Sequence, residues 1–346
     1  MNKLIFDVII LGTSPICILE AVNRSRNGEK VMIVEKRNFI GGAWNSLNIF
    51  GLENVENAIH YFLSNNKGIN FLSKNLAIDI VECKFKYRIF KFPILGYLHL
   101  KYNSIISKLL DKTFNNNLSW EIIKNIFTKR EKSYYFKNGS IDLIKKVNKL
   151  LDDSDIIVNY NCNIKKIIFN DHKVCLFSEN DKNYFESKKV IFTNGSRLQN
   201  IYNNENKVEI IEKFQPRPSI HIFVNDSSLQ KVKEAIFIKD SLIKYAHEVS
   251  SYAKGNVNNK KIFIVALQHE IKETKSIYND VLEKLKKAKL CSVSSSIIET
   301  KWSNIYLPTL FNEDLKKVQK KIDKKRLFTL ETESFEDAIG NNSKRW

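Results

Sequence analysis

Runs of apolar residues and the turns between them predict that the chain begins with an α/β unit. Residues 6–12 form an apolar, β-branched run that ends at a glycine, which is typical of a strand buried on both faces. Helical spacing follows over 16–26, and residues 30–34 predict a second buried strand closed by Glu35. A strand, a helix and a second strand ending in an acid is the order expected of a Rossmann-like, dinucleotide-binding unit.

The turn between the first strand and the helix contains the first candidate binding residues. Its sequence is Gly12-Thr13-Ser14-Pro15, with only the first glycine of the usual G-x-G-x-x-G pattern, since Ser14 and Cys17 occupy the other two glycine positions. Pro15 suits the first helical position, where its missing N–H costs nothing. The helix N-terminus still offers N–H groups to an anion, so we expect Gly12, Thr13, Ser14 and Pro15 to bind a pyrophosphate.

The remaining pattern predicts helices and strands in mixed order. Helices are expected over 67–80, 98–130, 281–290 and 315–326, and in a segment that begins at Ser140, whose hydroxyl oxygen should cap it. Strands are expected over 81–93, 156–158, 164–169, 173–177, 184–185, 189–195, 219–224, 235–238 and 261–267.

The composition narrows the classes of function. With 346 residues, 43% of them hydrophobic, the chain is long enough for two domains with full cores. The net charge of +18 comes mostly from lysine, since only 9 of the 56 basic residues are arginine, and we therefore expect no specific nucleic-acid binding. The five cysteines show neither CxxC pairing nor metal-ligand spacing. No apolar run suits a transmembrane helix and no secretory pattern is visible, so we expect a cytoplasmic protein with reduced cysteines.

The segment after the second strand resembles that of a known superfamily. Glu35 is followed by basic residues and then by a Gly-Gly pair, as in the flavoproteins with two dinucleotide-binding domains: the amine oxidase, protoporphyrinogen oxidase and UDP-galactopyranose mutase superfamily. The resemblance implies that FAD is bound, with its adenosine ribose on Glu35 and its phosphate region near Arg37. The other residues that it places beside the cofactor are Lys36, Gly41, Gly42, Ala43 and Trp44.

A histidine further along the chain has two interpretations. The stretch from Glu56 to Lys67 resembles the G-x-H-x-F-H-T-N segment of the mutases, and His60 then matches the histidine that lies beside the flavin. Ala58 replaces the glycine of that segment and Leu63 replaces its second histidine. The other interpretation is a core histidine that bonds a backbone carbonyl.

The resemblance also points to residues beyond His60 in the chain. It implies a cavity between two domains in which His60 would lie with Arg88, Arg217 and Tyr306 as candidate catalytic residues, and Trp302 would approach the flavin. The Gly-Asp pair that the superfamily has near its end is missing here, and Glu331 and Glu333 stand near its place.

The resemblance implies an α/β fold with a Rossmann-like FAD-binding domain and a second, α+β substrate domain inserted discontinuously. Residues 1–92, 135–215 and 300–346 would form the first domain, and 93–134 and 216–299 the second. The expected function is a flavin-dependent oxidoreductase or mutase-like enzyme acting on a nucleotide sugar or a related small molecule, with NAD(P)H as a further candidate reductant. The alternative is a flavin-free binding protein on the same fold, like the GDP-dissociation inhibitors, that is not an enzyme.

Overall fold

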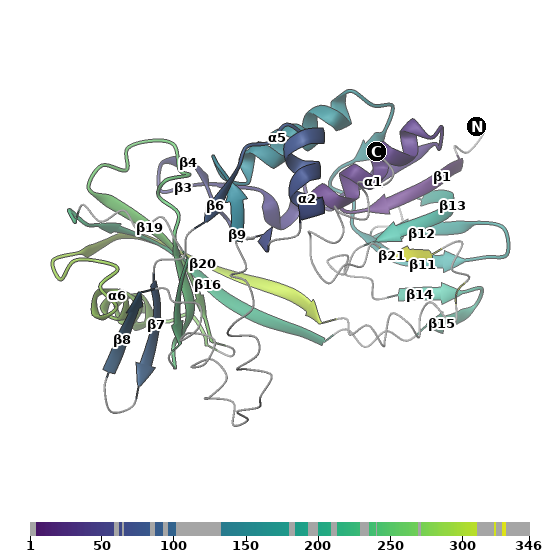
Figure 1. Cartoon of the computed structure of the whole chain (residues 1–346). Coiled ribbons are helices and arrows are strands. Elements are labelled where there is room, and N and C mark those ends of the chain that lie inside the picture. Colours follow the sequence, from purple (N-terminus) through teal and green to yellow (C-terminus); the bar gives the residue numbers. More distant parts are fainter. Residues whose placement is uncertain are drawn as a thin grey trace, which may run out of the picture.

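Two large sheets at opposite ends of the molecule organise the structure, which is a computed structural model (Figure 1). Strands β16 and β20 of the second sheet reach from it toward the first (Figure 1). The structure describes residues 5–58, 62–63, 66–83, 87–92, 96–101, 133–179, 184–192, 200–208, 213–228, 235–239, 241–268, 271–309, 322 and 327–329.

The first sheet has nine strands and a parallel centre. Its order is β10-β2-β1-β13-β12-β11-β14-β15, and β21 pairs with the C-terminal end of β13. Strands β10, β2, β1, β13 and β21 run parallel, whereas β12 pairs antiparallel with both β13 and β11. The strands are β1 (Ile5–Leu11), β2 (Val31–Val34), β10 (Ile157–Asn159), β11 (Ile164–Phe169), β12 (Val174–Ser178), β13 (Tyr184–Phe192), β14 (Asn200–Asn203), β15 (Asn206–Val208) and β21 (Leu327–Thr329).

Both faces of the parallel centre are buried, which explains why its strands are apolar throughout. Val8 and Ile10 point to the face covered by α1 (Pro15–Arg26) and α5 (Ile141–Asp152), where they share one core cluster with both helices. Ile9 belongs to the opposite cluster, together with residues of β11, β12 and β14. Alternate residues of β1 therefore face two different core clusters. The predicted α/β class is confirmed.

The second sheet has seven strands in the order β20-β16-β19-β18-β17-β7-β8. All neighbours are antiparallel except β17 and β7. Helix α6 (Lys275–Lys287) buries its apolar side against one face, in a cluster that includes residues of β16, β18 and β19. The strands are β20 (Ser296–Thr309), β16 (Lys213–Asn225), β19 (Lys260–Leu267), β18 (Ile243–Glu248), β17 (Ala235–Lys239), β7 (Tyr87–Phe92) and β8 (Gly96–Lys101).

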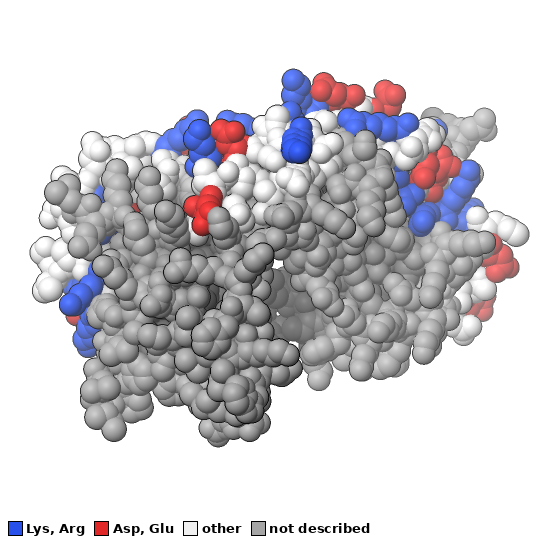
Figure 2. Space-filling model, viewed as in Figure 1, with Lys and Arg blue, Asp and Glu red and all other residues white. Residues whose placement is uncertain are grey.

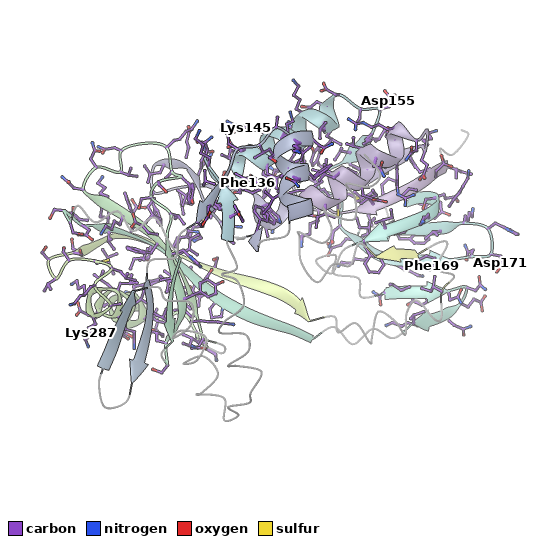
Figure 3. All side chains as sticks on the ribbon, viewed as in Figure 1. Phe136, Lys145, Asp155, Phe169, Asp171 and Lys287 are labelled. Atoms are coloured by element: carbon purple, nitrogen blue, oxygen red, sulfur yellow. The ribbon has the colours of Figure 1, made fainter. Side chains whose placement is uncertain are left out.

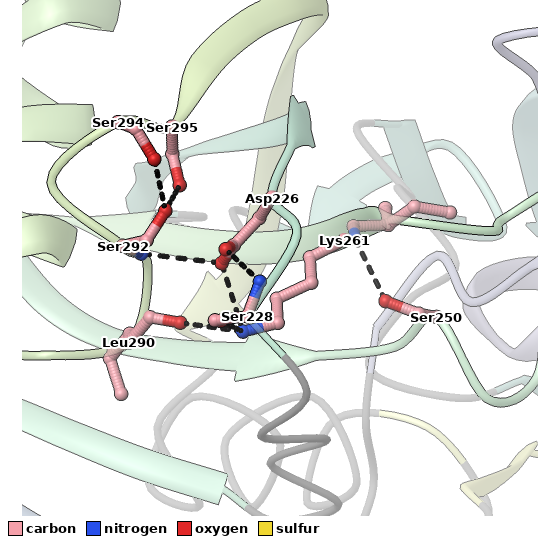
Figure 4. A network of polar contacts seen from close by, with 9 residues as sticks. Asp226, Ser228, Ser250, Lys261, Leu290, Ser292, Ser294 and Ser295 are labelled. Carbon is pink, nitrogen blue, oxygen red and sulfur yellow. Dashed lines mark hydrogen bonds and ion pairs between the residues drawn. The ribbon is translucent and has the colours of Figure 1, made fainter.

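A buried ion pair lies at one end of the second sheet (Figure 4). The Lys261 ammonium lies 2.9 Å from Asp226 Oδ2 and also donates to Ser228 Oγ and to the carbonyl oxygen of Leu290. Desolvation raises the pKa of Asp226, but the hydrogen bonds from Lys261 and Ser228 outweigh it and hold that pKa below its usual value. Because the charge and the hydrogen bonds of both partners are satisfied by neighbouring residues, we interpret this pair as structural.

Smaller elements connect the two sheets. They are the hairpin β3 (Leu47–Ile49) and β4 (Leu52–Val55), the three-stranded sheet of β5 (Phe62–Leu63), β9 (Ser133–Phe136) and β6 (Ile80–Cys83), the short helix α2 (Asn66–Asn70), the π-helical turn Phe71–Asn75 and the 3₁₀ turn Gly42–Trp44. Residues of β4 pack with Phe223 of the second sheet. Phe136 ends β9 in the core cluster that contains α1 and α5, and Phe169 ends β11 in the cluster on the opposite face of the first sheet (Figure 3).

The structure departs from the predicted elements between residues 80 and 101. The predicted strand 81–93 is divided, because β6 pairs with β9 whereas β7 pairs with β8 and β17 in the second sheet. Residues 98–101 lie in β8, where a helix was expected, and 102–130 lie outside the described residues, as do most of 315–326. The predicted division assigned 87–92 and 300–309 to the first unit, whereas both segments lie in the seven-stranded sheet.

Among the described residues, no helix combines the length and the apolar character needed to cross a membrane. On the face shown in Figure 2, acidic and basic side chains of the described residues are interspersed along the upper edge. That part of the surface therefore lacks the continuous basic stripe typical of nucleic-acid binding.

Candidate functional site

The site is built on the turn between β1 and α1. Gly12 ends the strand with a φ of +95°, a conformation that favours glycine, and its N–H donates to the carbonyl oxygen of Val34 at 2.8 Å. Ser14 is the N-cap of α1, its hydroxyl accepts from the Cys17 N–H, and Pro15 occupies the first turn as expected. The first turn of α1 contains no acidic residue, so the positive end of the helix faces no carboxylate of its own.

Glu35 ties this turn to the end of β2. Its Oε2 accepts from the Thr13 N–H at 2.9 Å and from the Thr13 hydroxyl at 2.6 Å, and its Oε1 accepts from the Arg37 N–H at 2.9 Å. Both Glu35 and Thr13 are buried. The acid therefore holds the glycine turn directly.

The Gly-Gly segment is joined to the same turn. The N–H of Gly41 donates to the carbonyl oxygen of Thr13 at 2.9 Å, and the Arg37 guanidinium donates to the carbonyl oxygen of Gly42 at 3.3 Å. The two glycines differ, because a Cβ on Gly41 would meet Ile144 Cδ1 at 2.6 Å, whereas a Cβ on Gly42 would meet no atom within 4 Å. Gly41 therefore allows close packing on α5, and Gly42 borders open space.

Trp44 and Ala43 complete this segment. Trp44 is buried, stacks on Phe62 with ring centroids 6.2 Å apart, and meets Phe136 edge-on. Ala43 is exposed beside it. Trp44 thus anchors the segment in the core of the first unit.

Cys17 occupies the position where the usual pattern has its third glycine. The side chain is fully buried between β1 and α1, and its thiol lies 3.9 Å from the carbonyl oxygen of Leu11. Desolvation by burial raises the pKa of this thiol to about 12, so it stays protonated at neutral pH. The packing of strand and helix accommodates a thiol here, and the missing third glycine does not prevent the fold.

An exposed rim surrounds Glu35. Lys36 and Arg37 are exposed, and the Arg37 guanidinium lies 5.4 Å above the ring of Phe39. The N–H of Asn161 donates to the carbonyl oxygen of Arg37, which brings Tyr160 to the same rim. Cationic and aromatic side chains are therefore available at the carboxyl end of β2, where open α/β sheets bind their ligands.

The backbones of three predicted catalytic residues, Arg88, Arg217 and Tyr306, lie in the second sheet. Arg217 pairs with Ile305 in the β16–β20 ladder, one position from Tyr306. Arg88 lies in β7, which β17, β18 and β19 separate from β16 in the order of the second sheet. His60 lies outside the described residues, as do Glu331 and Glu333.

Trp302 packs against the core of the second unit. It belongs to β20 and is partly buried against the cluster that α6 covers. Its register partner is Ile220 of the same cluster. Trp302 therefore packs against the cluster that α6 covers, and its approach to the flavin stays a prediction.

The sequence did not single out Glu56, a second buried acid. It follows β4, and its carboxylate accepts from the Ser140 N–H at 2.7 Å, the Ser140 hydroxyl at 2.8 Å and the Tyr135 hydroxyl at 3.0 Å. The Ser140 hydroxyl was expected to cap α5, but it makes no capping bond and donates to Glu56 instead. An acid directly after the apolar residue that ends a short strand was the available signal.

Comparisons with known proteins identify the fold. No protein-family model and no curated protein sequence matches the chain. A solved structure of putrescine oxidase bound to putrescine matches with a TM-score of 0.65 at 12% identity, over 99% of this chain and 98% of the other.

Two further structures match over most of their lengths. A candidate protoporphyrinogen oxidase from Exiguobacterium sp. 255-15 has a TM-score of 0.67 at 9% identity, over 99% of this chain and 98% of the other. An oxidoreductase from Methanosarcina mazei has a TM-score of 0.58 at 13% identity, over 86% and 88%. The chain has the fold of these oxidoreductases. The resemblance to the amine oxidase and protoporphyrinogen oxidase group is thus confirmed for the fold.

Proposed function

We propose that the chain is a flavin-dependent oxidoreductase that binds FAD at the β1–α1 turn. The observation that carries the proposal is the convergence of three segments: the Gly12–Pro15 turn, Glu35 at the end of β2, and Gly41–Gly42, joined by the Thr13 bonds to Glu35 and Gly41. The fold likeness to oxidoreductases that include putrescine oxidase supports the same class of function.

The residues present fit a dinucleotide. A Cβ at Gly12 or at Gly42 would meet no atom within 4 Å, so the main chain at both positions is open to close approach by a ligand. The N-terminus of the twelve-residue helix α1 offers its dipole to a pyrophosphate. Ser14 occupies the second glycine position, and because its hydroxyl is bonded within the turn to Cys17, its side chain is directed into the cap.

Each segment then has a role toward the cofactor. Glu35 would hold the turn in shape and accept from the ribose, Arg37 would neutralise phosphate charge, and the two open glycines would allow the main chain to approach. When bound, a flavin supplies hydride or electron transfer, or covalent flavin–sugar chemistry as in the mutases. The second sheet with α6 would be the substrate domain, inserted discontinuously, and the substrate a nucleotide sugar or a related small molecule.

Titration with FAD tests the proposal with a matched pair of glycine variants. Gly42 and Gly51 have similar φ values, +57° and +66°, and a Cβ on either would meet no atom within 4 Å. Gly42→Ala and Gly51→Ala therefore carry the same backbone strain, but only the first adds a methyl group beside the proposed site. We expect wild type and Gly51→Ala to bind FAD alike, and Gly42→Ala to bind roughly 10-fold more weakly or worse because the methyl group obstructs close approach.

The absorbance and fluorescence of bound flavin provide the measurement. Folded protein that binds no flavin at high FAD concentration would exclude the enzymatic proposal and favour a flavin-free binding protein on this fold. Equal FAD affinity in the two alanine variants would mean that a bound flavin lies away from Gly42.

A further inference from the structure

We propose that Thr13 is a specificity-determining residue whose hydroxyl occupies a position on Glu35 that a ribose hydroxyl would otherwise take. The proposal rests on the proposed function, because only a chain that binds a nucleotide at this turn presents a ribose to Glu35. It concerns how many ribose hydroxyls the site can recognise.

The carboxylate of Glu35 is nearly saturated by the chain itself. A carboxylate offers about four acceptor positions, two on each oxygen. The two positions on Oε2 are taken by the Thr13 N–H at 2.9 Å and the Thr13 hydroxyl at 2.6 Å. Oε1 accepts from the Arg37 N–H at 2.9 Å. Within the part of the chain that the structure describes, one acceptor position is left, and it is on Oε1.

Of these three donors, only the Thr13 hydroxyl depends on the side chain. The N–H groups of Thr13 and Arg37 belong to the main chain and are present whatever the side chain is. Thr13 is 1% exposed and Glu35 is 5% exposed, so water cannot readily replace a donor that is removed. The residue type at position 13 therefore decides whether Glu35 has one open acceptor position or two.

The consequence is unequal recognition of the two ribose hydroxyls. With one open position, Glu35 can accept from either the 2′-hydroxyl or the 3′-hydroxyl of the adenosine ribose, and the other hydroxyl must find a different partner. Without the Thr13 hydroxyl, both oxygens of Glu35 would be open to the ribose. Thr13 thus lowers the affinity for the ribose and makes the site discriminate between its hydroxyls.

Calorimetric titration with ADP tests this without any flavin chemistry. Thr13→Val keeps the shape of the side chain and removes the hydroxyl, and Thr13→Ser keeps the hydroxyl. We expect Thr13→Val to bind ADP about 10-fold more tightly than wild type, as one added hydrogen bond to a charged acceptor allows, and Thr13→Ser to match wild type. Weaker binding by Thr13→Val would mean that the hydroxyl itself bonds the ribose, and unchanged binding would mean that Glu35 gains no contact; either result overturns the proposal.

A second measurement on the unaltered protein does not depend on the folding of a variant. The probes are 2′-deoxy-ADP and 3′-deoxy-ADP. We expect one of them to bind wild type about 10-fold more weakly than ADP and the other within about twofold of it, and equal losses for both would overturn the proposal. Failure of ADP and FAD alike to bind folded protein would instead overturn the proposed function, and this inference with it.

Discussion

Two buried glutamates follow two short strands, and their surroundings differ. Glu35 ends β2 and Glu56 follows β4, and each accepts three hydrogen bonds from neighbouring residues. Glu35 lies beside glycines that border open space, whereas a Cβ on Gly139 would collide with the carboxylate of Glu56. The comparison teaches that burial and hydrogen bonding do not by themselves identify a ligand site, and our proposal of a site at Glu35 rests on the space that adjoins it.

Glu56 connects parts of the fold that are distant in sequence. Its carboxylate joins the end of β4 to Tyr135 in β9 and to Ser140 at the start of α5, and its carbonyl oxygen accepts from His221 Nε2 of the second sheet at 2.9 Å. Desolvation by burial raises the pKa of Glu56, against the lowering effect of the Ser140 and Tyr135 hydrogen bonds. We therefore infer that Glu56 stabilises the junction of the two units.

We expect the largest effect, a fall in the free energy of unfolding, when the carboxylate of Glu56 is removed from this junction. Glu56→Ala leaves the Ser140 N–H, the Ser140 hydroxyl and the Tyr135 hydroxyl without their acceptor in a buried place, and we expect it to lower the free energy of unfolding by about 3 kcal/mol or more. Urea denaturation measures the change. Glu53→Ala in β4, the strand that precedes Glu56, is the control, because Glu53 is exposed and its removal should cost less than about 0.5 kcal/mol. Similar losses in the two variants would contradict the assigned role of Glu56.

Glu35 should show the opposite balance between stability and ligand binding. Of its three donors, the Arg37 N–H lies at the exposed rim, where water can replace the carboxylate, whereas the Thr13 N–H and hydroxyl are buried. We therefore expect Glu35→Ala to cost about 2 kcal/mol of unfolding free energy, less than Glu56→Ala. The FAD affinity of Glu35→Ala should fall roughly 10-fold, because the ribose loses its carboxylate. Paired urea and FAD titrations measure both. A ligand effect in Glu56→Ala larger than that in Glu35→Ala would reverse the comparison.

The apolar pattern predicted the first unit well because its information is local. β1, α1 and β2 follow from a continuous apolar run, a proline at the first helical position and a second run, and the structure has all three within a residue or two of the expected bounds. The resemblance assigned the glycine turn and the acid at the end of β2 to one cofactor, which implied that they lie close together.

The predictions that failed concern contacts between residues that lie far apart in the chain. Alternation over 81–93 predicts extended backbone but cannot say which sheet each half joins, and β6 and β7 join different ones. A capping rule assigns the Ser140 hydroxyl to its own helix, yet Glu56, 84 residues away, takes it. The saturation of Glu35 by Thr13 has the same origin, because it is a contact across 22 residues that no motif encodes.

The smallest expected effect is a dependence of stability on pH that comes from Glu56 alone. In the unfolded chain its carboxyl should titrate near 4.5, and in the folded chain its pKa is raised by burial. Between these two pKa values the folded state binds more protons than the unfolded state, so the free energy of unfolding falls as pH rises. The contribution of Glu56 is therefore full below about pH 4.5 and is lost as pH rises through the raised pKa.

Glu56→Gln isolates the pH-dependent contribution of the Glu56 carboxyl because an amide does not titrate. We expect the unfolding free energy of wild type, relative to that of Glu56→Gln, to fall as pH rises from acidic to neutral, by about 1.4 kcal/mol for each unit by which the folded pKa exceeds the unfolded one. Burial lowers the pKa of His221, which contributes stability of the opposite sign, lost as pH falls below its unfolded value of 6.5. That contribution is common to both proteins and cancels in the difference. Parallel pH profiles for wild type and Glu56→Gln, measured by urea denaturation, would show that Glu56 has the same pKa folded and unfolded, and that its burial at the junction is electrostatically neutral.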